Sequence, residues 1–379
     1  MRKLTQRRKA WLLRRAQYEV QRRAHRPINV MGARRATALQ VFRTARASLP
    51  EANLLYDERP GLCVLRPPAD LNFEGNYDES LAFLMDIRGR SVGRPILHPK
   101  TGKPLRILTD FAALRTISSG AGLVLAAEID RRRLVTGAKP RSWDEEWDPA
   151  VRAYFEQAGL FELLGIQPQL TSTDSPPTSD LQAVRFIRGR SVRGEYGAAL
   201  RDRLEALCGK TIGPKRTVYE AISEAIANTR HAYPQDVAIW PTKATGSWWA
   251  AGTWNSATDV VSLQLYDQGV GIPATLPRSG HWSDIMKMVG LGERLHPERS
   301  DDRLIVAALE VGRTSTGEQG RGKGLAEMAS WIDKLGNGFL RITSGRGSIT
   351  YRSDGETSGT SRRAPFCGTL IEWEIGLGG

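Results

Sequence analysis

The 379-residue chain has few cysteines and histidines, and no long apolar run. Its three cysteines, Cys63, Cys208 and Cys367, are odd in number and widely spaced, which is typical of reduced thiols in a cytosol rather than of a disulfide framework. The five histidines never cluster with cysteine or acid at zinc spacing, so no structural metal is expected. No stretch approaches the roughly 18 uncharged apolar residues of a spanning helix, and the N-terminus lacks a signal-peptide pattern. We therefore expect a cytoplasmic protein without a transmembrane segment.

Acidic residues are almost absent from the first fifty positions. This segment holds 14 lysines and arginines but only one acid, Glu19, whereas the other 329 residues carry forty charges of each sign. The whole net charge of +13 therefore belongs to an N-terminal arm, residues 1–46, in which 4–24 have the composition of a basic helix. Nucleic acid, anionic lipid or an acidic protein surface would each suit such an arm. A solvated extension or an organelle transit peptide would have a similar composition.

The rest of the chain divides at residues 170–180, a segment rich in turn-forming residues that we interpret as a linker. Before it, residues 47–169 predict helices over 79–87 and 122–132 and a strand over 105–108. After it, residues 181–379 form a second block. Its expected elements are helices at 215–230, 304–311 and 326–335 and strands at 248–254, 260–266, 339–343, 349–352 and 369–375. This alternation predicts an α/β fold class.

One short sequence occurs in both blocks. The hexapeptide Ile-Arg-Gly-Arg-Ser-Val stands at 87–92 and again at 187–192. Nothing around it repeats, so no internal duplication is inferred.

Two polar side chains share one edge of the helix expected at 215–230. Glu224 and Asn228 are four residues apart, beside an apolar stripe with helical spacing. A carboxylate so placed can act as a general base on a water, and an amide oxygen can bind Mg²⁺. Such pairs are common on helix surfaces, so this pair gains meaning only together with other motifs.

A first glycine-rich segment follows the strand expected at 260–266. That strand runs directly into Asp267-Gln-Gly269-Val-Gly271. A carboxylate at a strand end can accept a hydrogen bond from an exocyclic amino group, and glycines let the backbone approach a flat ring closely. By itself the segment is also compatible with an ordinary tight turn.

A second glycine-rich segment, Gly320-Arg-Gly322-Lys323-Gly324, opens the helix expected at 326–335. Backbone N–H groups before a helix N-terminus bind anions, and the lysine adds a positive charge. Residues 317–323 also fit the first seven positions of a P-loop, but residue 324 is glycine where Ser or Thr should bind Mg²⁺, and a helix precedes it. The spacing also differs from a dinucleotide fingerprint. We therefore expect a phosphate-binding segment of another kind.

Together these motifs resemble the GHKL ATPase domain, the Bergerat fold shared by DNA gyrase and the sensor kinases. The helix with Glu224 and Asn228 is similar to the N box of that family, the segment at Asp267 to its adenine-binding box, and 320–324 to its phosphate-lid box. Near the C-terminus, Gly368-Thr369 before a strand resembles the family's closing Gly-Thr element. The resemblance covers roughly half the chain and implies an α+β sandwich with helices on one face of a mixed sheet.

The resemblance also implies a role for each motif residue. Glu224 would be the general base, Asn228 would coordinate Mg²⁺ through the ATP phosphates, and Asp267 would bind the adenine amino group. Thr369 would support the adenine pocket. The other implied cofactor-binding residues are Gly269, Gly271, Gly320, Gly322, Lys323 and Gly324. Slow hydrolysis by a water that Glu224 activates is expected, while phosphate transfer and simple nucleotide switching remain open.

The first block resembles, over a shorter stretch, the STAS domain of anti-sigma-factor antagonists. An apolar strand, Asp110, and then Ser118-Ser119 at a helix start are similar to the place where a GHKL serine kinase phosphorylates that domain. An ordinary serine helix cap is the alternative. A histidine kinase is not expected, because no histidine lies between His98 and His231.

These observations predict a cytoplasmic, bacterial ATP-binding regulator, for which a homodimer is plausible. The segment 273–319, between the two glycine boxes, would be a lid that orders around ATP and changes a surface shown to a protein partner. One alternative is a nucleic-acid-binding protein, for instance in a defence or stress system, that acts through its arm. The other is a serine kinase of the anti-sigma type.

Deletion of residues 1–46 tests the arm. If the arm binds DNA or RNA, the full chain binds with an affinity that falls steeply between about 50 and about 200 mM salt, because phosphate contacts displace counterions. The shortened chain loses that binding. Fluorescence anisotropy with a labelled duplex measures both effects, and equal binding by the two chains would leave the arm without this role.

Overall fold

The computed structural model describes residues 40–51, 54–56, 62–89, 96–97, 104–137, 146–164, 180–190, 194–234, 245–290, 301–314 and 324–378. The predicted basic helix at 4–24, nearly all of the predicted linker and residues 320–323 lie outside this set. Within it, no helix is long and apolar enough to cross a membrane. Its cysteines, Cys63, Cys208 and Cys367, are all buried free thiols.

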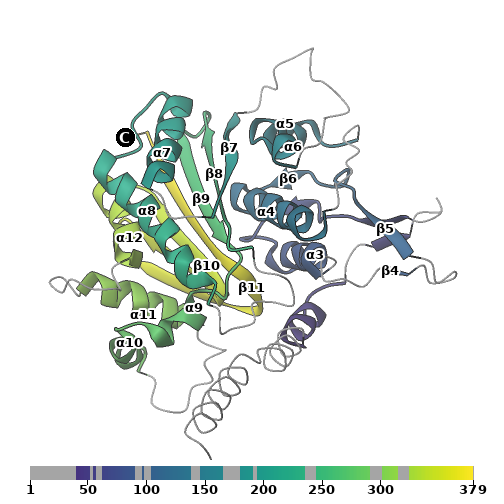
Figure 1. Cartoon of the computed structure of the whole chain (residues 1–379). Coiled ribbons are helices and arrows are strands. Elements are labelled where there is room, and N and C mark those ends of the chain that lie inside the picture. The colour runs from purple at the N-terminus through teal and green to yellow at the C-terminus, as the bar shows by residue number, and fades with distance from the viewer. Residues whose placement is uncertain are drawn as a thin grey trace, which may run out of the picture.

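A five-stranded sheet in the order β10-β11-β9-β8-β7 forms the centre of the structure (Figure 1). Its strands are β7 (Leu181–Gly189), β8 (Trp248–Asn255), β9 (Val260–Asp267), β10 (Phe339–Arg352) and β11 (Thr357–Gly376). All its pairs are antiparallel, so the expectation of a mixed sheet is wrong. For two of the four pairs the physical reason is that short turns join β8 to β9 and β10 to β11, and a tight turn can connect only antiparallel neighbours.

The strand β10 joins two strands that the sequence predicts separately, at 339–343 and 349–352. Register shifts between Ser344, Gly345 and Gly347 mark a bulge in its pairing with β11. The bulge interrupts the alternation of buried and exposed residues, so the sequence pattern reads as two strands.

Four helices cover one face of the sheet (Figure 1). They are α7 (Gly194–Cys208), α8 (Lys215–Ala232), α11 (Asp301–Thr314) and α12 (Gly324–Leu335). The predicted apolar stripe of α8 is buried, with Val218 and Ile222 fully inaccessible. Three short helices, α9 (Ile272–Thr275), η2 (Leu276–Arg278) and α10 (Trp282–Val289), follow β9.

The opposite face of the sheet is covered as well, by helices of the first block (Figure 1). These are α3 (Tyr77–Gly89), α4 (Ser119–Thr136), α5 (Pro149–Gln157) and α6 (Leu160–Leu164). The described helices of 181–379 that cover the sheet lie on one face, as expected, whereas the layer that the first block adds on the other face was not expected. The strands present Trp249, Tyr266 and Phe366 on this side, and these large rings are removed from water only by a second layer. One continuous apolar cluster joins both predicted blocks.

Short strands complete the first block. One sheet has the order β1-β2-β5-β4, formed by β1 (Leu54–Tyr56), β2 (Leu62–Leu65), β5 (Pro104–Thr109) and β4 (Ile96–Leu97), with β2 parallel to β5. A second parallel pair joins β3 (Asp70–Leu71) to β6 (Thr116–Ile117). The predicted strand at 105–108 and helix at 122–132 are thus confirmed as β5 and α4. The resemblance to a STAS domain stays a prediction.

The C-terminal end of the predicted arm belongs to the packed structure. Residues 40–47 are helical, and Phe42 and Ala45 are buried in the cluster of the first block. Arg46 forms an ion pair with Asp86 of α3, with 2.8 Å between Nη2 and Oδ2. A truncation that tests the arm alone is therefore better placed after residue 39.

Phe366→Ala tests whether the two blocks share one core. Phe366 is 2% exposed and packs edge-on against Phe73 of the first block and Tyr266 of β9. Its truncation is expected to cost about 3–5 kcal/mol, in a single unfolding transition that includes both blocks. Urea unfolding followed by tryptophan fluorescence and by circular dichroism measures this. Leu134→Ala, at an exposed position of α4, should change stability by less than about 0.5 kcal/mol; two separate transitions would contradict the shared core.

Candidate functional site

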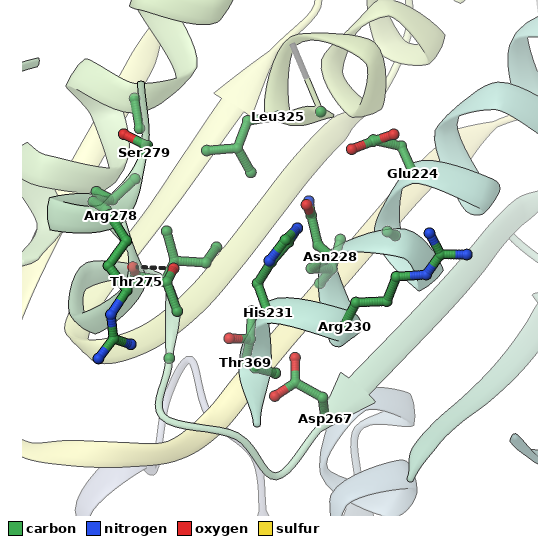
Figure 2. Close-up of a pocket in the computed structure, with 18 of the residues that line it drawn as sticks. Glu224, Asn228, Arg230, His231, Asp267, Thr275, Arg278, Ser279, Leu325 and Thr369 are labelled. Atoms are coloured by element: carbon green, nitrogen blue, oxygen red, sulfur yellow. Dashed lines mark hydrogen bonds between the residues drawn. The ribbon is translucent and has the colours of Figure 1, made fainter. Parts of the chain in front are cut away.

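A cavity of about 460 Å³ opens between the end of α8 and the segments that follow β9 (Figure 2). Cavities of 300–1,000 Å³ hold small-molecule ligands and cofactors. Six of the residues singled out in the sequence line it: Glu224, Asn228, Asp267, Gly271, Gly324 and Thr369. They come from α8, the end of β9, the start of α12 and β11. Residues far apart in the sequence therefore meet in one place.

Glu224 and Asn228 point into the cavity from one edge of α8 (Figure 2). The Glu224 carboxylate lies against Gly324, where any Cβ would collide with it. Burial, and then the nearby charge of Glu327, raise the pKa of Glu224 above its usual value. A raised pKa brings a carboxylate closer to the range in which a general base works at neutral pH. The first turn of α12 begins at the same point, and the first N–H groups of a helix have no partner within the helix itself.

Asp267 closes the floor of the cavity. It is 5% exposed and stands at the last position of β9, where the carboxylate Oδ1 accepts a hydrogen bond from Gly269 N at 2.7 Å. Burial raises the pKa of Asp267 to about 7, although the Gly269 N–H group and Arg88 oppose the shift. The second carboxylate oxygen is left for a donor in the cavity, such as an amino group on a ring.

Thr369 faces Asp267 across the pairing of β9 with β11 (Figure 2). Its hydroxyl lies 3.0 Å from the hydroxyl of Ser344 on β10. Ser344 Oγ also accepts a hydrogen bond from Ile272 N at 2.8 Å. Gly271 has φ +88°, and a Cβ there would lie 2.9 Å from Ser344 Oγ, so this turn favours glycine. Ser344 thus connects Thr369 to the turn after β9.

The cavity has apolar walls and several basic side chains that the sequence motifs do not include. Apolar groups line it from α8 to β11: Ala225, Ile272, Leu276, Ile285, Ala308, Val311, Leu325 and Ile371. His231 stands between Asn228 and Asp267, whereas the side chains of Arg230 and Arg278 extend away from the centre (Figure 2). His281 lines the cavity from the start of α10. His231 is three residues from Asn228, so helical spacing alone points to it; no local pattern points to His281.

Some residues expected at the site lie elsewhere. Gly269 is not among the residues that line the cavity; it packs against the C-terminal end of α8, where a Cβ would collide with Ala232. Gly320, Gly322 and Lys323 are outside the described residues. In the part of the chain that the structure describes, no three His, Cys, Asp or Glu side chains gather as a metal site.

Ser118 and Ser119 lie on the other side of the sheet. Ser118 is the N-cap of α4, where its hydroxyl accepts a hydrogen bond from Ala121 N at 3.3 Å. The Ser119 hydroxyl lies 2.9 Å from that of Thr253 on β8. The central sheet therefore separates both serines from the cavity of the same chain.

Neither the protein-family models nor the curated proteins compared with the chain match it.

The pKa of Asp267 predicts how stability depends on pH. Because the carboxyl binds its proton more tightly in the folded state than in the unfolded state, stability should fall as pH rises from about 4 to about 7. Asp267→Asn removes this contribution and should be more stable than wild type at pH 8 by roughly 1–3 kcal/mol. Urea unfolding over this pH range measures the slope. Burial also raises the pKa of Glu372 to about 7, so part of the pH dependence should remain in Asp267→Asn. A variant whose stability changes with pH as steeply as that of wild type would contradict the prediction.

Proposed function

We propose that the chain is an ATP-binding regulator of the GHKL kind and that this cavity binds Mg²⁺–ATP. The observation that carries the proposal is the convergence of all four sequence motifs on one cavity, represented by Glu224, Asp267, Gly324 and Thr369. Chance placement would scatter motifs that lie so far apart along the chain. Such a regulator would act in the bacterial cytoplasm.

The floor of the cavity suits an adenine ring. The Asp267 carboxylate can accept from the exocyclic amino group, and the Thr369 hydroxyl lies beside it. Apolar side chains such as Ile272, Leu276 and Ile371 can contact the faces of a flat ring. A guanine ring would direct a carbonyl oxygen, an acceptor, at the carboxylate, so adenine is the preferred base.

The upper part of the cavity suits the phosphates. Asn228 offers an amide oxygen to Mg²⁺, an ion that usually keeps waters and phosphate oxygens among its ligands. The start of α12 offers N–H groups at Gly324, and the absence of a side chain there leaves room beside Glu224. His231 adds a donor between the two ends of the site. Glu224 is the base that takes a proton from the attacking water, which makes slow hydrolysis the expected reaction.

The predicted lid, 273–319, is divided in two by its packing. Residues of α11 such as Ile305 and Leu309 are fully buried in the core, and α11 packs on β10 and α12. The short helices α9, η2 and α10 supply Thr275, Leu276 and Ile285 to the cavity wall. We therefore assign the nucleotide-dependent conformational change, within the described residues, to residues 272–290 rather than to α11. The surface of residues 272–290 is then the one offered to a protein partner.

ATP binding and hydrolysis by Glu224→Gln and Asp267→Asn test the proposal. Glu224→Gln keeps the size of the side chain but removes the base, so it should bind ATP within about threefold of wild type and hydrolyse it at least about 100-fold more slowly. Asp267→Asn places an amide at the adenine amino group and should weaken ATP binding by about tenfold or more. Calorimetry and phosphate release measure these values with Mg²⁺ present.

Wild-type behaviour separates the alternatives. No ATP binding by the wild-type chain would overturn the proposal. Binding without phosphate release would leave a nucleotide switch, or a serine kinase that acts on another molecule. Labelled phosphate on Ser118 or Ser119 that depends on Glu224 would identify a kinase.

A further inference from the structure

Gln268, directly after the proposed adenine-binding carboxylate, faces away from the cavity. Side chains alternate between the two faces of a strand, so Tyr266 and Gln268 lie on the side that α4 covers (Figure 1). Gln268 is 4% exposed, and its Nε2 donates to Glu128 Oε1 of α4 at 3.0 Å. The turn that carries Asp267 is thus bonded to the first block on the face of the sheet opposite the cavity.

Glu128 is held in place by further donors. It is 2% exposed, and Arg88 Nε of α3 donates to its two oxygens at 3.0 and 3.1 Å. The Tyr266 hydroxyl lies 3.2 Å from Oε1, and Arg131 stands 3.9 Å from Oε2. A buried carboxylate with charged and neutral donors around it has one favourable position, because moving it would leave charges unpaired in a low dielectric.

The main chain at Gln268 is held from the cavity side as well. Gln268 N donates to the hydroxyl of Tyr233, which follows α8, at 2.9 Å. Val270 N donates to Ala232 O at 2.9 Å, and Gly269 N bonds the Asp267 carboxylate. The turn that carries Asp267 is therefore fixed between α8 on one face and α4 on the other.

The repeated hexapeptide explains how α4 is anchored. Its first copy ends α3 and supplies Arg88 to Glu128, and its second copy ends β7 and supplies Arg188 to Asp130, with 2.9 Å between Nη1 and Oδ2. The same short sequence thus pairs with two acids two residues apart on α4. Each acid also accepts from a neutral side-chain donor: Gln268 Nε2 for Glu128, beside the Tyr266 hydroxyl, and Trp249 Nε1 for Asp130 at 3.1 Å. Only Gln268 belongs to the turn that carries Asp267.

We propose that Gln268 and Glu128 are positioning residues for nucleotide recognition: α4, anchored by the two arginines of the repeat, holds the turn at 267–272 so that Asp267 meets the base. This role rests on the proposed ATP binding. It makes the first block part of the nucleotide site without contact with the nucleotide. It also means that displacement of α4 from the sheet would weaken selection of adenine.

Gln268→Met tests this role, with Trp249→Phe as its matched control. Gln268→Met keeps the length of the side chain and the Arg88–Glu128 pair but removes the donor to Glu128. Trp249→Phe removes the equivalent donor to Asp130 and keeps an aromatic ring. Calorimetry with ATP and with GTP, together with melting temperatures, is carried out on the full chain. Gln268→Met is expected to weaken ATP binding by about five- to tenfold and to lower the ATP-to-GTP preference by a similar factor. Trp249→Phe should leave the ATP affinity and the ATP-to-GTP preference within about twofold of wild type, even if it lowers the melting temperature as much as Gln268→Met does.

A second variant removes the charge on the other side of the contact. Glu128→Gln keeps the shape of Glu128 and should show the same loss of ATP preference as Gln268→Met. Because both changes act on one contact, the double variant should lose no more than the larger single loss. If Glu128→Gln does not fold, the ATP and GTP affinities of Gln268→Met alone decide whether the positioning role holds.

The two proposals fail differently. A wild-type chain that binds no ATP would overturn the proposed function. Wild-type ATP binding combined with an unchanged ATP-to-GTP preference in Gln268→Met would overturn the positioning role alone, and so would fully additive losses in the double variant.

Discussion

The antiparallel pairing of β9 with β11 places Asp267 beside Thr369, and the rest of the cavity depends on that register. A shift by one residue would turn Asp267 toward α4 and bring Gln268 into the cavity, because neighbouring side chains of a strand face opposite sides. Gly368 secures the register, since any Cβ at this position would collide with the Asp267 carbonyl oxygen. Ser344 then links Thr369 to Ile272. The floor of the cavity is thus a product of strand pairing rather than of a flexible loop.

The parts of the site that depend only on residue spacing within one helix or strand were predictable from the sequence. The spacing of Glu224 and Asn228 on a helix, and the place of Asp267 at a strand end, need only the geometry of one element. Ser344 and His281 were not predictable, because their roles depend on contacts between distant segments. The second helical layer was missed for the same reason: nothing in the pattern of β9 says which segment will cover Tyr266. β7 was missed because a register shift with β8, between Val184 and Ile187, disturbs its alternation.

Two kinds of contact join the first block to the sheet, and they do different things. The apolar cluster around Tyr266 and Phe366 removes large rings from water and supplies the stabilisation. Arg188 of β7 pairs with Asp130 of α4, and Arg88, which pairs with Glu128 inside the first block, donates to Tyr266 and to the Cys367 carbonyl of the sheet. These ion pairs contribute little net stability once desolvation is counted, but a shift of α4 by one turn would leave them unpaired. Apolar contacts therefore hold the layers together, while the charges fix where α4 lies along β9.

The position of β11 has a consequence for how the chain folds during synthesis. Tyr77 of α3 donates a hydrogen bond to Ala364 O of β11 at 3.2 Å, across 287 residues of sequence, and Leu370 is buried in the same cluster as α3 and α4. The first block emerges early from a ribosome but cannot complete its core until β11 has been made. Its apolar surface thus stays incompletely covered through most of translation, a period in which binding by a chaperone would protect it from aggregation.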